Sequence, residues 1–275
     1  MTASRFVSSL LFVSVFVAAG QAQSGAPAAP QPTPAQNAGA TPPAPPPLPN
    51  CTELAAALGR LVNADSRVRD FSNQARYRDA NATVTDARVV FMGDSITDAW
   101  PQPRFGTFFT GKNYVGRGIS GQTTPQMLMR FRADVINLKP RVVVILAGTN
   151  DIAGNTGAMT NEEIQDNLAS MAERAAANKI KVVLSSITPT SSYHVGNAPA
   201  PQTTLRPLAR IRAINEWMKN YAARNGHIYL DYFSAMIDDT GQLKSELSGD
   251  DLHPNAAGYA IMAPLADAAI GRALK

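Results

Sequence analysis

Cysteine and histidine are scarce in this chain. One cysteine, Cys51, occurs in 275 residues, so no internal disulfide can form. Cys51 also lies far beyond the apolar N-terminal segment, whereas a lipid-anchored bacterial protein carries its cysteine directly after such a segment. The three histidines, His194, His227 and His253, leave few candidates for a general base.

Charged residues are also few, at 17% of the chain, and the net charge is +4. No Lys/Arg-rich run produces this positive charge, because the basic residues are scattered. A nucleic-acid site would need a clustered basic patch interleaved with aromatic residues, so we expect no nucleic-acid partner. A solvated face is expected to carry the scattered arginines, which include Arg67, Arg69, Arg76, Arg78, Arg130 and Arg132.

The first apolar run is too short to span a bilayer. Residues 1–22 have the features of a secretory signal peptide, with Arg5 as the positive start, an apolar stretch from Leu10 to Ala19, and small residues for cleavage after Ala22. A retained N-terminal anchor is the alternative. We therefore expect a periplasmic or secreted protein with no stable membrane span after signal cleavage.

Two segments separate this signal from the rest of the chain. Residues 23–50 hold half of the 20 prolines and no charge, a composition that favours extended conformations and is interpreted as a disordered linker. Residues 51–86 show apolar residues at helical spacing, with Thr52 as the expected cap. We interpret them as an N-terminal helical extension that packs against the main domain, with partner binding as the alternative.

From residue 87 to residue 275 the pattern alternates strand, turn and helix. Continuous apolar runs, such as Val142–Leu146, are typical of parallel strands buried on both faces. The expected strands are Arg88–Met92, Asn113–Gly116, Arg141–Leu146, Lys181–Ser185 and His227–Leu230. Thr124 is expected to cap a helix over 125–137, and Thr160 with Glu163 to form a capping box for the next. The order predicts one α/β domain, a three-layer α/β/α sandwich around a five-stranded parallel sheet.

The first of these strands ends in Gly93-Asp94-Ser95. The glycine stops the strand in a tight turn, which places Ser95 at the carboxyl edge of the sheet, where open α/β folds bind their ligands. A serine hydroxyl becomes a nucleophile when a base removes its proton and a carboxylate orients that base. Ser95 is therefore the candidate nucleophile.

His253 is the best candidate for the base. It lies between two acids and a proline at the entrance to the last helix, whereas His227 opens a strand and His194 lies in a polar loop. Asp250 can curl back toward the imidazole across one turn, while Asp251 is expected to point elsewhere. The alternatives are a surface-turn histidine and two acids that stabilise the helix N-terminus.

Polar residues also follow the second and third strands. Gly121 would let a backbone N–H approach a ligand closely, and Asn150 can donate from its side-chain amide. Turn or cap chemistry alone would explain either residue. Their coincidence at successive strand ends favours oxyanion donors beside Ser95.

Four separated blocks resemble the SGNH hydrolases, also called GDSL-type esterases and lipases. In order they are Gly93-Asp94-Ser95-Ile96, Ser120-Gly121-Gln122-Thr123, Gly148-Thr149-Asn150-Asp151 and Asp250-Asp251-Leu252-His253-Pro254. The resemblance covers about residues 88–274 and implies a flavodoxin-like sandwich that needs no metal and no cofactor. Ile96 and Thr149, where many members have Leu and Gly, make the chain similar to the platelet-activating-factor acetylhydrolase-like and bacterial lysophospholipase-like branch.

The resemblance also implies a role for each matching position. Ser95 would be the nucleophile, His253 the general base and then the acid, and Asp250 the residue that orients His253. The N–H groups of Ser95 and Gly121 and the side chain of Asn150 would form the oxyanion hole. The implied partner is a small ester, lipid or acylated glycan substrate.

The sequence indicates less about the substrate. The long segment Ser186–Thr204 follows the fourth strand and is expected to line the substrate pocket. Aromatic residues from Trp100 to Phe109 could offer an apolar surface or simply pack in the core. No long hydrophobic lid is evident, which favours short acyl groups or lone lipid chains.

Three functions stay open at this point. The first is a secreted ester hydrolase acting on short acyl esters, lysophospholipids or acetylated carbohydrates. The second is an O-acyltransferase that uses the same residues on a cell-envelope glycan. The third is a non-catalytic envelope or carbohydrate-binding module, which the intact Ser95, Asp250 and His253 disfavour.

Overall fold

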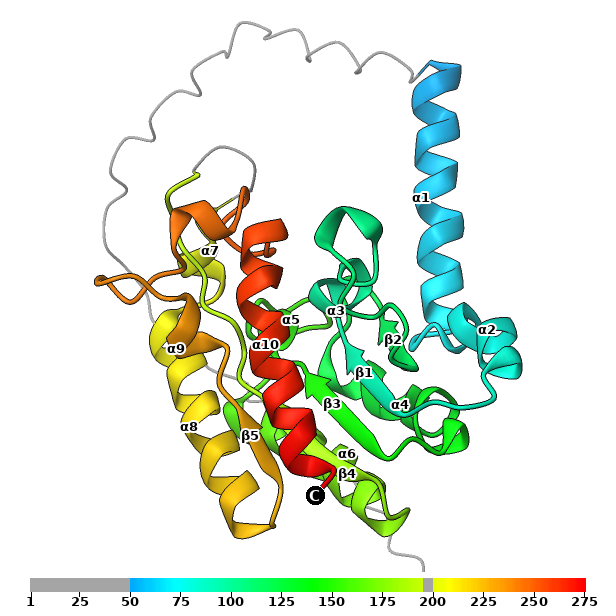
Figure 1. The fold of residues 1–275 in the computed structure, drawn as a ribbon. Helices are drawn as coiled ribbons and strands as arrows, with labels where there is room; N and C mark the ends of the chain where they lie inside the picture. Colours follow the sequence, from blue (N-terminus) through cyan, green and yellow to red (C-terminus); the bar gives the residue numbers. More distant parts are fainter. Residues whose placement is uncertain (1–49, 195–199) are drawn as a thin grey trace, which may run out of the picture. The chain divides into compact units, whose positions relative to one another are not determined.

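The computed structural model describes residues 50–194 and 200–275 (Figure 1). The predicted signal peptide, residues 1–22, and all but the last residue of the predicted linker lie outside the described residues. No described helix is long and apolar enough to cross a membrane.

A parallel sheet of five strands forms the centre of the domain, in the order β2-β1-β3-β4-β5. Its strands are β1 (Val89–Gly93), β2 (Tyr114–Gly118), β3 (Val142–Leu146), β4 (Lys181–Ser185) and β5 (Ile228–Leu230). In register, Gly93 pairs with Gly118 on one side and with Leu146 on the other. The carboxyl ends of β1, β2 and β3 therefore meet at one edge of the sheet, as predicted.

Helices cover both faces of this sheet (Figure 1). The described helices are α1 (Cys51–Arg69), α2 (Arg78–Thr83), α3 (Ser95–Ala99), α4 (Thr124–Asp134), α5 (Thr149–Ile152), α6 (Asn161–Ala177), α7 (Gln202–Leu205), α8 (Leu208–Arg224), α9 (Phe233–Met236) and α10 (Ala256–Ala273). Alternate residues of β1 enter different cores, so Val90 packs with α4, α6 and α8, while Val89 packs with α10. The three-layer α/β/α sandwich predicted from the apolar runs is confirmed.

The helix caps agree with the sequence in part. Thr160 and Glu163 form the predicted capping box of α6. The cap of α4 is Thr123 rather than Thr124, because the box is closed by Gln126, three residues after Thr123. Thr52 is likewise the wrong cap for α1. The side chain of Asn50 accepts the backbone N–H of Glu53 at 2.9 Å, and the Glu53 carboxylate accepts that of Asn50.

The N-terminal extension packs against the domain only in its second half. The apolar residues of α1 are exposed, with Leu58 at 62% and Val68 at 81%, so the packing expected for this helix is not observed. The residues after α1 do pack. Asn81 of α2 donates to Asp134 Oδ1 at 2.7 Å, and Gln126 donates to the carbonyl of Phe71 at 2.6 Å.

Arg130 is buried, which corrects the expectation that it lies on a solvated face. Its side chain is 0% exposed and pairs with Asp134 at 2.9 Å. The guanidinium also donates to the carbonyls of Gly93 at 3.0 Å and Arg117 at 2.9 Å, and to Gln122 Oε1 at 2.6 Å. The sequence does not reveal this role, because Arg130 lies between Met129 and Phe131, and only its tertiary contacts show that the side chain is buried and paired.

The turn from β1 into α3 is closed by a buried carboxylate. Asp94 Oδ1 accepts the backbone N–H of Ile96 at 3.0 Å and so caps α3, whose first residue is Ser95. Asp94 Oδ2 has no hydrogen-bond partner among the described residues. Burial, only partly offset by the Ile96 N–H, raises the pKa of Asp94 to about 6. Gly118 lies against the backbone of this turn, where a Cβ atom would overlap Asp98 N and Thr97 C.

Replacing Arg130 should strongly destabilise the fold. Arg130→Met would leave the buried Asp134 carboxylate and two strand-end carbonyls without their donor, so the free energy of unfolding should fall by about 3–5 kcal/mol. Urea denaturation would measure the loss. The matched control is Arg132→Met, an exposed position on the same helix, which should change stability by no more than about 0.5 kcal/mol. Equal losses in the two variants would contradict the structural role.

Asp94 should make stability fall as pH rises through 6. Its pKa is higher in the folded chain, about 6, than the ordinary value of 3.8, so the folded state holds a proton that the unfolded state has released. Relative to Asp94→Asn, which mimics the protonated acid, the wild type should lose up to about 3 kcal/mol between pH 4 and pH 7. Urea denaturation of both proteins across this range would measure the difference. A constant difference between them would refute the prediction.

Candidate active site

The structure brings Ser95 and His253 together from opposite ends of the domain. Ser95 is the first residue of α3, and His253 lies in the loop before α10. Ser95 Oγ is 2.9 Å from His253 Nε2, although 158 positions separate the two residues in the sequence. The imidazole is therefore within reach of the serine proton, which is the geometry that activation of a serine requires.

Asp250 holds the other side of the same imidazole. Its Oδ2 is 2.6 Å from His253 Nδ1, and its Oδ1 accepts the backbone N–H of His253 at 2.8 Å and that of Leu252 at 3.2 Å. Burial alone would raise the pKa of Asp250, but these bonds outweigh it and hold the pKa well below its ordinary value. A carboxylate that stays ionised can orient the imidazole and stabilise its protonated form.

Asp251 points away from His253, as predicted, and anchors another segment. Its backbone is left-handed, with φ 66°, so its side chain leaves on the side opposite that of Asp250. Its Oδ1 accepts Ser191 Oγ at 2.6 Å and lies 2.9 Å from His194 Nδ1. Its Oδ2 accepts the backbone N–H of His194 at 2.8 Å. Asp251 therefore holds the segment that follows β4 rather than stabilising the N-terminus of a helix.

Two backbone N–H groups near Ser95 are available for a ligand. Neither Ser95 nor Gly121 donates its N–H to an acceptor within residues 50–194 and 200–275. Gly121 has φ 80°, a left-handed conformation that a side chain would strain, and its carbonyl accepts from Asn155 Nδ2 at 3.0 Å. The N–H of Gly121 therefore has no acceptor among the described residues, in a turn at the edge of the sheet where β1 also ends.

Asn150 lies almost fully buried at the start of the segment after β3. Its Nδ2 donates to the carbonyl of Gln122 at 3.0 Å, and its Oδ1 accepts from Arg206 Nη2 at 3.3 Å. An amide nitrogen carries two N–H groups, so one remains for another acceptor. The role of Asn150 as an oxyanion donor stays a prediction.

The segment Ser186–Thr204 has two parts, and residues 195–199 lie outside those described. Its first part is buried and runs along the 250–253 loop, where the N–H of Ser191 donates to the carbonyl of Asp251 at 3.1 Å. Tyr193 then emerges at the surface, 44% exposed, with its hydroxyl 2.6 Å from Asp238 Oδ2. The expectation that this segment lines the substrate pocket stays a prediction.

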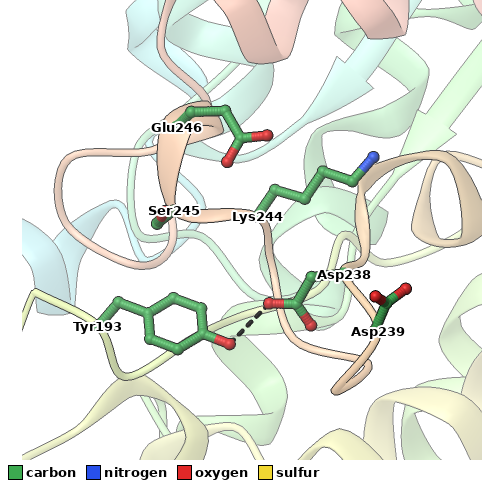
Figure 2. A pocket seen from close by; sticks show the side chains of 6 residues that line it. All are labelled: Tyr193, Asp238, Asp239, Lys244, Ser245 and Glu246. Carbon is green, nitrogen blue, oxygen red and sulfur yellow. Dashed lines mark hydrogen bonds between the residues drawn. The ribbon is translucent and has the colours of Figure 1, made fainter.

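Tyr193 lines a polar surface pocket of about 480 Å³ (Figure 2). The other residues around it are Asp238, Asp239, Lys244, Ser245 and Glu246. The N–H of Tyr193 donates to Asp251 Oδ1 at 3.1 Å, so the wall of the pocket is tied to the loop that carries Asp250 and His253. Trp100, the first of the aromatic residues that follow Ser95, is buried and stacks on Tyr259 with ring centroids 5.3 Å apart.

The remaining histidine, His227, lies at the opposite edge of the sheet. It precedes β5 and packs beside the ring of Tyr221, with centroids 6.0 Å apart. Burial lowers its pKa. Within the described residues no group of three or more His, Cys, Asp or Glu side chains is arranged to hold a metal ion.

Arg206 and Asp94 belong to the surroundings of this site and were not singled out from the sequence. Asp94 had a signal, because an acid directly after a strand and before a short helix is a typical N-cap. Arg206 had none. It precedes Pro207, and only the folded chain shows that its guanidinium reaches back to Thr149 and Asn150.

The comparisons with known proteins agree with the fold. Residues 91–261 match the model of the GDSL-like Lipase/Acylhydrolase family. A GDSL-like lipase from Bacteroides thetaiotaomicron has a similar structure, with a TM-score of 0.68 and 41% identity over 74% of this chain and 99% of that one. The expected family and fold are therefore confirmed, while the narrower branch stays a prediction.

Two curated proteins are similar over shorter or more divergent regions. The acetylxylan esterase of Geobacillus stearothermophilus is 26% identical over 203 residues, covering 64% of this chain and 90% of that protein. The uncharacterised lipoprotein YqeF of Bacillus subtilis is 35% identical over 75 residues, which are 26% of this chain and only 31% of that protein. With a family model that spans most of the domain and a solved relative of high identity, the chain belongs to the GDSL-like lipase/acylhydrolase family.

Proposed function

We propose that the protein hydrolyses carboxylic esters through an acyl-serine intermediate formed on Ser95. The observation that carries this proposal is the 2.9 Å approach of Ser95 Oγ to His253 Nε2, with Asp250 on the far side of the ring. Membership of an acylhydrolase family supports ester hydrolysis as the reaction.

Each half of the reaction uses the same proton carrier. In the first, Ser95 Oγ attacks the ester carbonyl carbon while its proton passes to His253 Nε2, which then gives that proton to the departing alcohol. In the second, His253 takes a proton from water as the water oxygen attacks the acyl carbon, and returns it to Ser95 Oγ. The charge on the carbonyl oxygen would be met by the N–H groups of Ser95 and Gly121 and by the amide of Asn150.

We propose a short acyl group on a polar alcohol, such as an acetylated carbohydrate, as the substrate. The pocket beside the 250–253 loop is lined by charged and hydroxyl side chains rather than by aliphatic ones. Of the aromatic side chains after Ser95, Trp100 is buried, and Phe105, Phe108 and Phe109 are partly buried against the same core. A relative that is named an acetylxylan esterase supports the same substrate class.

We also propose that the protein acts in the periplasm or outside the cell. The support is the signal-peptide pattern of residues 1–22 and the charge-free, proline-rich segment that follows it. Sequencing the N-terminus of the mature protein would test this, since cleavage should leave Gln23 first.

Labelling with a fluorophosphonate should modify Ser95 and no other serine. Ser95→Ala should abolish labelling and lower kcat/KM for p-nitrophenyl acetate by about 10⁴-fold or more, because the nucleophile is lost. His253→Ala should label far more slowly. Mass spectrometry of the modified peptide identifies the site. Matched controls are Ser234→Ala and His227→Ala, which lie outside the proposed site and should behave as wild type. Unchanged hydrolysis by Ser95→Ala would refute the assignment.

Activity on p-nitrophenyl esters should be highest for short acyl chains. A series from acetyl to palmitoyl should give the largest kcat/KM at acetyl or butyryl, because the sequence has no long hydrophobic lid to hold a longer chain. Release of acetate from acetylated xylo-oligosaccharides, measured against p-nitrophenyl acetate, would then test the polar alcohol. A clear optimum at palmitoyl would contradict the proposed substrate class.

A further inference from the structure

Arg206 is a buried cation that contacts the residue proposed as an oxyanion donor. Its side chain is 6% exposed. Nε donates to the carbonyl and the hydroxyl of Thr149, each at 3.1 Å, and Nη2 donates to Asn150 Oδ1 at 3.3 Å. Nη1 donates to Gln202 Oε1. Every acceptor in this set is a neutral oxygen.

The guanidinium lacks the ion pair that a buried arginine usually has. No carboxylate of the described residues lies within ion-pair distance of Arg206, in contrast to Arg130 with its Asp134. Burial lowers the pKa of Arg206, and the more distant charges of Asp94 and Asp250 oppose that effect. Burying a charge without a partner is unfavourable, so a stabilising role for the fold alone does not explain Arg206.

The contacts of Asn150 explain the buried Arg206 side chain better. Its two terminal atoms differ in what they can do, because Oδ1 only accepts and Nδ2 only donates. Arg206 offers only donors to one end of the amide, and the carbonyl of Gln122 offers only an acceptor to the other. A rotated amide would place N–H against N–H and carbonyl against carbonyl. Arg206 therefore determines which way the amide faces.

The backbone of Arg206 is held firmly enough for this task. The residue lies between α7 and Pro207, which is the N-cap of α8. Its carbonyl accepts the hydroxyl of Thr190 at 3.3 Å. The Arg206 guanidinium thus reaches from the residue before the N-cap of α8 to Thr149 and Asn150, which begin α5 after β3.

We propose that Arg206 is a positioning residue that fixes the Asn150 amide with its free N–H toward the developing oxyanion. The proposal rests on the proposed function, because it takes Asn150 as an oxyanion donor. Arg206 touches no reacting atom and acts through Asn150. Its effect should appear in the chemical step and should disappear when Asn150 is absent.

A double-mutant cycle tests this route. Arg206→Met should lower kcat for p-nitrophenyl acetate roughly 10–100-fold with KM changed less than about threefold, because the lost interaction matters mainly in the transition state. Asn150→Ala should lower kcat by about 10²–10³-fold. Adding Arg206→Met to Asn150→Ala should cost less than about threefold more, since its target is gone.

Two further variants complete the experiment. Arg206→Lys should recover only part of kcat, because an ammonium group cannot bond Thr149 and Asn150 together as the guanidinium does. Arg212→Met is the matched control, on the helix α8 that follows Arg206, where the guanidinium lies over the ring of Phe233, and it should keep the wild-type kcat. If Arg206→Met does not fold, Arg206→Lys and Arg206→Gln carry the same cycle.

The outcomes separate this proposal from the proposed function. The positioning role would be overturned if Arg206→Met lowered kcat equally in the wild type and in Asn150→Ala, or if all Arg206 variants kept the wild-type kcat. In either case fluorophosphonate would still label Ser95, so the proposed function would stand. A wild type in which Ser95 is not labelled and esters are not cleaved would instead refute the proposed function. Strong coupling between Arg206 and Asn150 in kcat supports the positioning role.

Discussion

The hydrogen bonds of Arg130 are the constraint on which the site depends. The guanidinium binds the carbonyl of Gly93, where β1 ends, and the carbonyl of Arg117 in β2. It also binds the side chain of Gln122, directly after Gly121. One buried cation therefore fixes the turn that carries Ser95 relative to the turn that carries Gly121. Its charge is balanced by Asp134 one helical turn away, so the arrangement tolerates full burial.

The other half of the site is assembled from two adjacent aspartates with different tasks. Asp250 turns back on its own loop and holds His253, three residues later. Asp251 has a left-handed backbone, so its side chain leaves in another direction and holds Ser191 and His194. Because the two carboxylates are consecutive, the base and the segment after β4 are positioned by the same short loop. A shift of that segment would be felt at His253.

A feature of the fold or of the site could be predicted from the sequence when its pattern lies within a short stretch of residues. The strands were predicted to within about two residues, because parallel buried strands are continuous apolar runs. Ser95, Asp250 and His253 were found because each follows a strand or precedes a helix in a recognisable block. Arg130 was misjudged and Arg206 was missed, since only tertiary contacts decide whether an arginine is buried. The apolar side of α1 was expected to pack against the domain but is exposed, because helical spacing predicts a helix without showing which surface the helix contacts.

The two buried arginines are linked through Gln122 and Asn150. Arg130 binds the side chain of Gln122, the carbonyl of Gln122 accepts from Asn150, and Arg206 binds the other end of the Asn150 amide. Arg130 is balanced by Asp134 whereas Arg206 has no ion pair among the described residues, so a developing negative charge beside Asn150 would be stabilised mainly by Arg206. Neither arginine lines the polar pocket of Tyr193. Because Tyr193 donates its N–H to Asp251, a change in the pocket would instead act on the site through the loop that carries Asp250 and His253.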